Sequence, residues 1–134
     1  MKNLLPLLFL SLAITLACKK KEDEVIKTTF VGLWQGKFGV SATQVPDRDL
    51  ILNITSDGNI KVYNGKDTTS AKEKAKGKWL TLGNQFGANY VYPSSPTETF
   101  SVTLNEFFDF TTLEGTWKST ANGAFGGRMI LKRK

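Results

Sequence analysis

The feature that most constrains the fold is a Gly-x-Trp triplet. It occurs three times and uses every tryptophan of the chain, as Gly32-Leu33-Trp34, Gly77-Lys78-Trp79 and Gly115-Thr116-Trp117. In a β-strand alternate residues share a face, so each triplet sets a glycine beside the largest side chain. The glycine lets the strand bend, and the indole fills the space inside the bend. The triplets therefore indicate a curved sheet wrapped around aromatic side chains.

Short stretches rich in β-branched and aromatic residues alternate with turn signals from residue 28 onward, and none has the period of a long amphipathic helix. The turn signals include Asp57-Gly58, Asn64-Gly65 and Gly83-Asn84, which tolerate the positive φ angles of tight hairpins. The pattern predicts about eight strands, over residues 28–40, 49–55, 60–63, 71–79, 85–92, 97–104, 111–118 and 127–132.

The segment 71–79 has a composition that would also suit a helix, but its alternation favours a strand. Four lysines fall on one face, and Ala75, Gly77 and Trp79 fall on the other. The lysines admit two interpretations. They form either a cationic stripe for phosphate, lipid headgroups or acidic glycans, or a solvated face that discourages edge-to-edge association.

Hairpin-length loops between these strands predict an all-β, up-and-down antiparallel sheet. Eight strands are enough for such a sheet to close into a barrel with no free edge. A strongly curled open meander and a sandwich are the alternatives. Alternation predicts a bulky inward face, made of Phe30, Trp34, Phe38, Leu52, Ile54, Val62, Trp79, Phe86, Tyr90, Phe100, Val102, Leu104, Trp117 and Met129.

The N-terminal segment is typical of a secretory signal peptide, because a short positive start precedes an apolar run from Leu4 to Ala17. Cys18, the only cysteine, follows that run directly. Residues 19–24 are all charged, which predicts a solvated tether. We therefore expect a signal peptide over 1–17, a lipidated cysteine with its tether over 18–27, and a β-barrel domain over 28–134.

The junction Ile14-Thr15-Leu16-Ala17-Cys18 resembles the lipobox of bacterial lipoproteins. That resemblance implies a diacylglyceryl thioether on Cys18, an acyl chain such as palmitate on its amine, and anchoring to the outer membrane. An ordinary signal peptidase could also cut after Ala17. Lys21-Glu22-Asp23 resembles the signal that sends some lipoproteins to the cell surface, so both the cell surface and the periplasmic face stay open.

Composition excludes several classes of function. The chain has no histidine and a single cysteine, which excludes the usual zinc, copper and haem sites and the catalytic triads that need imidazole. The net charge of +6 is a moderate surplus that favours anionic surfaces without requiring them. We expect no catalytic residue, metal, cofactor or nucleic-acid partner, and a monomer.

Gly32-x-Trp34 on the first strand of an eight-stranded meander resembles the lipocalin and avidin-like barrels of the calycin group. The stretch from Phe30 to Lys132 is similar to small bacterial lipocalin-like lipoproteins. The resemblance implies that Trp34 plugs one end of the barrel beneath an arginine from near the last strand. Arg128 is the candidate on the expected closing strand, although alternation points it outward if Met129 and Leu131 point inward.

An eight-stranded barrel is either filled by its own side chains or just wide enough for one small ligand. The bulky inward face favours a filled interior. A cavity, if formed, would be apolar, with the tyrosine hydroxyls orienting a guest. Its expected lining is Trp34, Trp79, Tyr90, Tyr92, Phe100 and Trp117.

Two functions follow from these possibilities, and an enzyme is the third and least supported one. One is an envelope lipoprotein that binds a small apolar ligand. The other is a filled-barrel lipoprotein that has a structural role or contacts another envelope protein, through its loops or through Phe107-Phe108.

Overall fold

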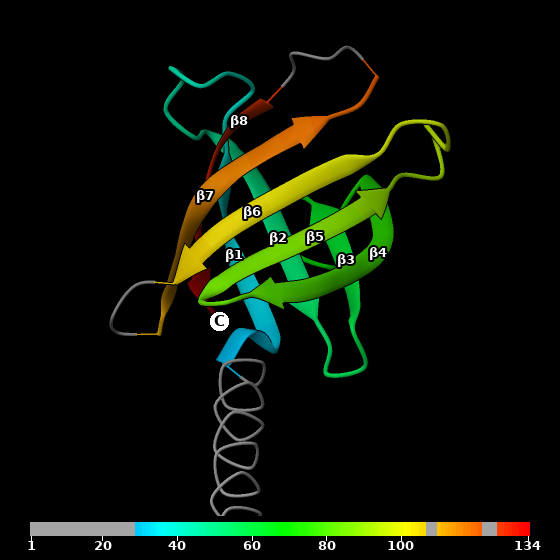
Figure 1. Cartoon of the computed structure of the whole chain (residues 1–134). Helices are drawn as coiled ribbons and strands as arrows, with labels where there is room; N and C mark the ends of the chain where they lie inside the picture. The colour runs from blue at the N-terminus through cyan, green and yellow to red at the C-terminus, as the bar shows by residue number, and fades with distance from the viewer. Residues whose placement is uncertain (1–28, 107–109, 122–125) are drawn as a thin grey trace, which may run out of the picture.

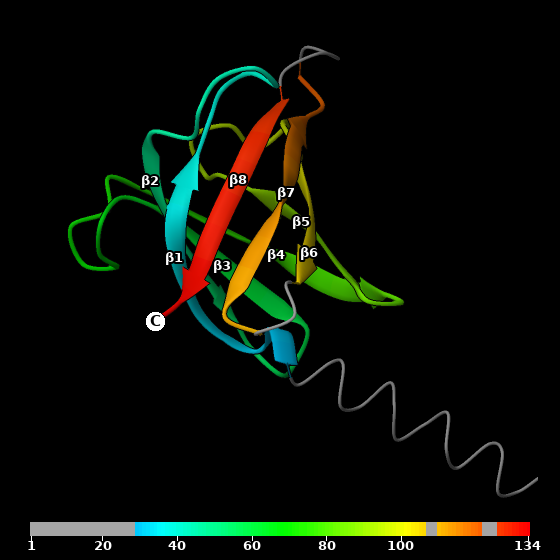
Figure 2. The same cartoon turned by 90° about the vertical axis from the view of Figure 1, so that its left-hand side faces the viewer.

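The computed structural model describes residues 29–106, 110–121 and 126–134 as one closed barrel. Consecutive strands pair antiparallel, and the last strand pairs with the first, which closes the sheet (Figures 1 and 2). The all-β up-and-down barrel is confirmed, and the open meander and the sandwich are not what the chain adopts. The strands are β1 (Gly32–Phe38), β2 (Arg48–Ile54), β3 (Asn59–Asn64), β4 (Glu73–Leu82), β5 (Gln85–Val91), β6 (Phe100–Glu106), β7 (Thr112–Ser119) and β8 (Gly126–Arg133).

The segment that also suited a helix is a strand, as its alternation predicted. β4 places Ala75 and Trp79 in the core, while the lysines between them are exposed. It also runs to Leu82, beyond the predicted limit of residue 79. On its outer face Lys76 lies opposite Lys61 of β3, so like charges share this wall of the barrel.

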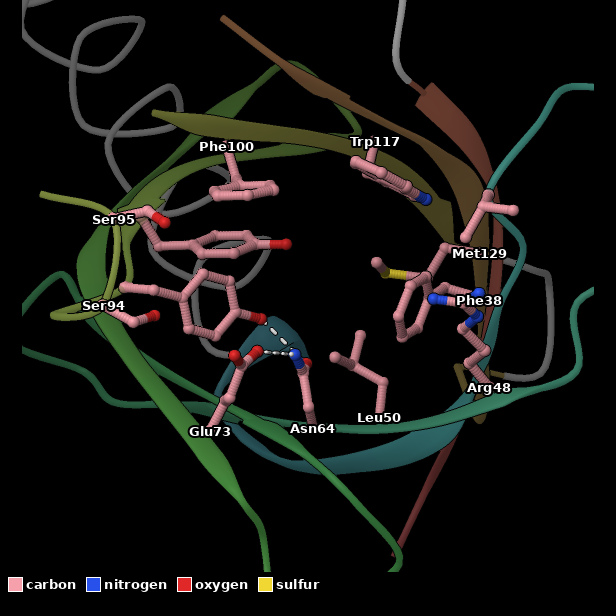
Figure 3. Close-up of a pocket in the computed structure, with 13 residues that line it drawn as sticks. Phe38, Arg48, Leu50, Asn64, Glu73, Ser94, Ser95, Phe100, Trp117 and Met129 are labelled. Carbon is pink, nitrogen blue, oxygen red and sulfur yellow. Dashed lines mark hydrogen bonds between the residues drawn. The ribbon is translucent and has the colours of Figure 1, made fainter. Parts of the chain in front are cut away.

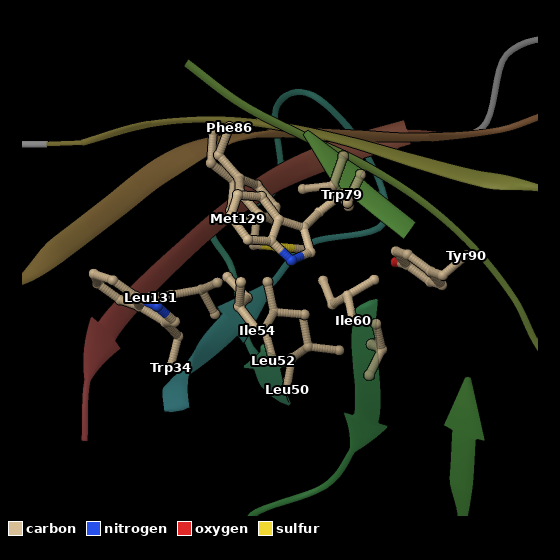
Figure 4. Close-up of a cluster of buried hydrophobic side chains, with 14 of the residues drawn as sticks. Trp34, Leu50, Leu52, Ile54, Ile60, Trp79, Phe86, Tyr90, Met129 and Leu131 are labelled. Carbon is tan, nitrogen blue, oxygen red and sulfur yellow. The ribbon is translucent and has the colours of Figure 1, made fainter. Parts of the chain in front are cut away.

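Every residue predicted to point inward belongs to the buried cluster or packs against it. Figure 4 shows Trp34 and Leu131 at one side of this cluster and Tyr90 at the other. Alternation was therefore enough to define the core. One buried hydrophobic side chain of the described residues lies outside it: Ile51, on the outer face of β2, is 0% exposed. Its neighbour on β1, Gln35, donates a hydrogen bond to the Lys66 carbonyl, so the loop after β3 folds back over this outer face.

The glycines of the second and third triplets lie where two strands approach closely. A Cβ at Gly77 would come 1.9 Å from the Asn89 carbonyl oxygen, and one at Gly115 would come 1.9 Å from that of Thr103. No side chain fits at that distance, so both positions require glycine. Gly32 differs, because it opens β1 with a φ of 140° and its nearest neighbour is the flexible Arg133 side chain.

We call the end of the barrel that carries Trp34 the sealed end. Trp34 is 0% exposed, and its indole Nε1 donates to the Phe30 carbonyl at 2.8 Å. The Arg133 guanidinium lies 4.3 Å above the indole ring, within the range of a cation–π contact. Its terminal nitrogens also donate to the carbonyls of Val31, at 2.9 Å, and Thr29. A cation and the chain before β1 therefore close this end.

The arginine expected over Trp34 was misassigned. Arg128 lies on the outer face, where it forms an ion pair with Glu114 at 2.5 Å. The physical reason is alternation: β8 continues one residue beyond the predicted Lys132, and Arg133 shares the inward parity of Met129 and Leu131.

The turn between β2 and β3 also lies at the sealed end. Gly58 has a φ of 82°, as the Asp-Gly signal predicted. The Asp57 carboxylate accepts hydrogen bonds from the Thr55 hydroxyl at 2.5 Å and from the side chain and backbone N–H of Asn59, which hold the pKa of Asp57 at about 2. The Thr55 carbonyl in turn accepts from the Trp79 indole at 2.8 Å, which ties this turn to the core.

Candidate functional site

A cavity of about 240 Å³ occupies the opposite end of the barrel, which we call the open end (Figure 3). It lies among the ends of β1, β3 and β5 and the starts of β2, β4 and β6. The interior is therefore filled at the sealed end and hollow at the open end. The apolar lining is Phe38, Val40, Leu50, Tyr90, Tyr92, Phe100, Trp117 and Met129, and the polar lining is Arg48, Asn64, Glu73, Ser94 and Ser95.

Aromatic rings in mutual contact form the main wall of the cavity. Tyr90 stacks on Phe100, with ring centroids 5.5 Å apart and planes 9° apart. Tyr92 meets both rings edge-on, at 5.8 and 5.2 Å. Trp117 continues the wall at 6.1 Å from Phe100, and Phe38 meets it edge-on at 5.9 Å. Such a wall presents flat apolar faces that suit a flat apolar guest.

Trp117 is held in place by its polar edge. Its indole Nε1 donates to the Gly39 carbonyl at 2.8 Å, just beyond the end of β1. A Cβ at Gly127 would come 1.9 Å from that same carbonyl oxygen and 3.1 Å from the indole nitrogen. Glycine at residue 127 therefore leaves room for the backbone and the indole that border the cavity.

A short hydrogen-bond chain forms one side of the mouth. The Tyr92 hydroxyl donates to Asn64 Oδ1 at 2.8 Å, and Asn64 Nδ2 donates to Glu73 Oε2 at 3.1 Å. Burial raises the pKa of Tyr92, and the nearby Glu73 charge raises it further against the lowering effect of the Asn64 bond. Tyr92 is therefore a neutral donor whose hydrogen is already engaged. Figure 3 shows Arg48 beside Phe38, across the cavity from Glu73.

The Tyr90 hydroxyl is in a different position. The residue is 4% exposed, and its hydroxyl forms no hydrogen bond with the residues that the structure describes. Burial raises the pKa of Tyr90, and the neighbouring Tyr92 raises it further. Tyr90 therefore presents a neutral, unpaired hydroxyl within an otherwise apolar wall.

The structure brings together four of the six residues expected to line a cavity, namely Tyr90, Tyr92, Phe100 and Trp117. Trp34 and Trp79 do not border it. Trp34 is enclosed at the sealed end, and Trp79 stacks on Phe86, with ring centroids 5.7 Å apart. Cys18, Phe107 and Phe108 lie outside the described residues.

Sequence reasoning missed the polar residues of the mouth, because they lie at strand ends and in a loop, where alternation carries little information. Asn64 ends β3, Glu73 and Arg48 begin strands, and Ser94 and Ser95 follow β5. A signal was available. In an up-and-down barrel every second connection lies at the same end, so residues beside those connections surround one mouth.

The described residues also lack two features, a cluster of metal-binding side chains and a membrane-spanning helix. No group of three or more cysteine, aspartate or glutamate side chains is arranged there to hold a metal ion. These residues also form no helix that is long and apolar enough to cross a membrane. The ionisable side chains around the cavity are Arg48, Glu73, Tyr90 and Tyr92.

Comparisons of the chain with models of protein families, with curated proteins and with solved structures found no significant match.

Proposed function

We propose that this protein is a lipid-anchored envelope lipoprotein whose lipocalin-like barrel binds a small apolar or aromatic molecule. The observation that carries the proposal is the cavity of about 240 Å³ at the open end, walled by aromatic rings. For comparison, an apolar cavity of about 150 Å³ is known to hold benzene. The space therefore suits a compound of one or two rings.

The proposed anchor is the diacylglyceryl and acyl group on Cys18. Two or three acyl chains anchor a protein almost permanently, since each buried methylene contributes about 0.8 kcal/mol. Lys21-Glu22-Asp23 supports placement on the outer membrane, at the cell surface or on its periplasmic face.

Under this proposal the tether joins the domain at the end opposite the cavity. The chain enters the barrel at the sealed end. There the Thr29 carbonyl accepts a hydrogen bond from Arg133, and the ring centroids of Phe30 and Phe86 lie 5.5 Å apart. A tether from Cys18 would therefore hold the sealed end toward the membrane. The cavity would open away from the lipid, so a guest would enter from the aqueous side.

Native mass spectrometry of the protein purified from its own host tests ligand binding. We expect an extra mass of a few hundred daltons or less that is lost on unfolding, because the cavity holds only one or two rings. A clean ligand-free mass over several preparations, with no binding when aromatic compounds are added, would contradict the proposal.

A Cys18→Ser variant tests the anchor separately. Labelling with radioactive palmitate should mark the wild type and not the variant, and the variant should leave the membrane fraction. A variant that stays tightly membrane-bound would contradict the anchor. Protease added to intact cells then distinguishes the two faces, because only protein displayed at the cell surface would be degraded.

A second function, contact with another envelope protein, is favoured by exposed apolar side chains near the sealed end. Leu80 and Leu82 of β4 are 53% and 63% exposed, and Phe110, between β6 and β7, is 55% exposed. Cross-linking in intact cells separates the two functions. A partner captured by the wild type and lost in a Leu80→Ser, Leu82→Ser variant that still binds aromatic compounds would assign this surface to protein contact.

A further inference from the structure

The Tyr90 hydroxyl is a buried polar group that the fold leaves unpaired. Tyr90 borders the cavity, is 4% exposed, and has no hydrogen-bond partner for its hydroxyl among residues 29–106, 110–121 and 126–134. Leaving a buried hydroxyl without a partner is unfavourable by about 1–3 kcal/mol. A group in this position needs either an ordered water or an atom supplied by a guest.

The neighbouring polar groups on the buried wall already have partners. The Tyr92 hydroxyl donates to Asn64, and the Trp117 indole donates to the Gly39 carbonyl. The ring of Tyr90 stacks on Phe100, with planes 9° apart, and this stacking orients its hydroxyl. Within this wall Tyr90 is therefore the residue with a hydrogen to offer a guest.

The hydroxyl offers that hydrogen at any physiological pH. Burial raises the pKa of Tyr90, so the group remains protonated where a free tyrosine would begin to ionise. A protonated phenol is a good hydrogen-bond donor to a carbonyl oxygen. The rings around it provide the apolar contact for the remainder of the molecule.

We infer that Tyr90 selects and orients the guest, and that the guest is a one- or two-ring aromatic compound bearing a hydrogen-bond acceptor such as a carbonyl oxygen. This inference rests on the proposed ligand-binding function and adds to it the chemical class of the ligand. The acceptor lies against the Tyr90 hydroxyl, and the rings of the guest lie against the wall of Phe100 and Trp117.

A matched pair of probes tests the inference. 1-Indanone and indane share one two-ring skeleton, and only 1-indanone has a carbonyl. Titration calorimetry of each compound with the wild type and with Tyr90→Phe gives four affinities. The preference for 1-indanone over indane should be about five- to tenfold larger in the wild type than in the variant, as expected for one hydrogen bond. Tyr63→Phe, on the outer face of β3, should leave the preference at its wild-type value.

The outcomes separate the two proposals. If both compounds bind and the preference is equal in wild type and Tyr90→Phe, the role of Tyr90 is overturned while ligand binding stands. If neither compound binds the folded wild type at millimolar concentration, both proposals fail. A loss of preference in Tyr63→Phe as large as that in Tyr90→Phe would also overturn the assignment to Tyr90.

A second measurement keeps the inference testable if Tyr90→Phe does not fold. In wild-type protein labelled with ¹³C at the tyrosine ζ carbon, 1-indanone should shift the Tyr90 resonance more than indane does, because that carbon carries the hydroxyl. Equal shifts with the two compounds would overturn the inference.

Discussion

The two ends of the barrel are built from similar residues, and only one of them is solid. At the sealed end Trp34 and Phe86 are 0% exposed, whereas at the open end Trp117 is 8% exposed and Phe38 and Phe100 are only partly buried. Each tryptophan donates its indole hydrogen to a nearby backbone carbonyl. Aromatic content therefore does not distinguish the ends.

The difference lies in what covers the rings. At the sealed end the Arg133 guanidinium lies over the Trp34 ring and bonds to carbonyls of the chain before β1. At the open end the rings border a cavity of about 240 Å³. The sealed end is closed because the Arg133 guanidinium and the backbone before β1 lie across Trp34, whereas the aromatic rings of the open end face the cavity.

The largest expected effect comes from truncating the two tryptophans in turn. Trp34→Ala should lower the free energy of unfolding by about 4–5 kcal/mol, because it leaves a void in a filled region. Trp117→Ala should lower it by about 2–3 kcal/mol, because that ring already borders empty space. Urea denaturation of both variants measures the pair, and an equal or reversed order would contradict the distinction between the ends.

A methyl group at Gly115, in the middle of β7, should destabilise the barrel as a whole. Gly115→Ala places a Cβ 1.9 Å from the Thr103 carbonyl oxygen, so we expect a loss of about 3 kcal/mol from strain between β6 and β7. Gly87→Ala is the matched control. Its nearest neighbours would lie 3.9 Å away, so the free energy of unfolding should stay within about 1 kcal/mol of wild type. Thermal unfolding measures both variants, and equal melting temperatures would contradict the close approach at Gly115.

Removing the Arg133 guanidinium should lower the stability of the protein without changing ligand binding at the open end. Arg133→Met removes the contact with Trp34 and the bonds to the backbone before β1, so we expect a loss of about 2 kcal/mol in the free energy of unfolding. Arg128→Met, which breaks an exposed ion pair with Glu114, should cost less than about 1 kcal/mol. Affinity for 1-indanone should be unchanged in both variants. A drop in affinity in Arg133→Met alone would mean that the two ends are coupled.

Alkaline pH should lower the stability of the protein through Tyr90 at the open end. Burial raises the pKa of Tyr90 in the folded protein, so above about pH 10 the unfolded chain loses this proton while the folded chain keeps it. Stability from this group is complete below pH 10 and falls as pH rises beyond it, by about 1 kcal/mol over the next unit. Denaturation between pH 8 and 11 should show a shallower decline in Tyr90→Phe than in the wild type. Parallel declines would show that the hydroxyl is not buried.

Much of the fold could be predicted because it depends on alternation and on turn residues. Alternation identified the inward face from Phe30 to Met129, and it recognised β4 as a strand despite its helical composition. The same rule pointed Arg128 outward, but the strand boundary was set one residue too short to include Arg133. An error at one boundary thus hid the arginine that covers Trp34 at the sealed end.

The cavity could not be predicted in the same way, because it is a small difference between the volume of the barrel and the volume of its side chains. The sequence identified Tyr90, Tyr92, Phe100 and Trp117 as inward but not which inward residues face empty space. The burial of Ile51 was missed for a related reason, since it depends on the path of a loop across the outer face. Such features depend on contacts between segments far apart in the chain.

The pairing of β1 with β8 also determines when the protein can fold. Trp34 lies opposite Arg133, and the Lys134 N–H donates to the Leu33 carbonyl, so β8 and the residue after it complete the pairing of the first strand. Contacts between residues so distant in sequence form slowly, because the loop entropy must be lost before the contact is gained. A growing chain that lacks β8 has two unpaired sheet edges, at β1 and β7, which are sites for aggregation. The ring closes only after β8 has arrived, so a chaperone that covers the edges of β1 and β7 would protect an unfinished chain.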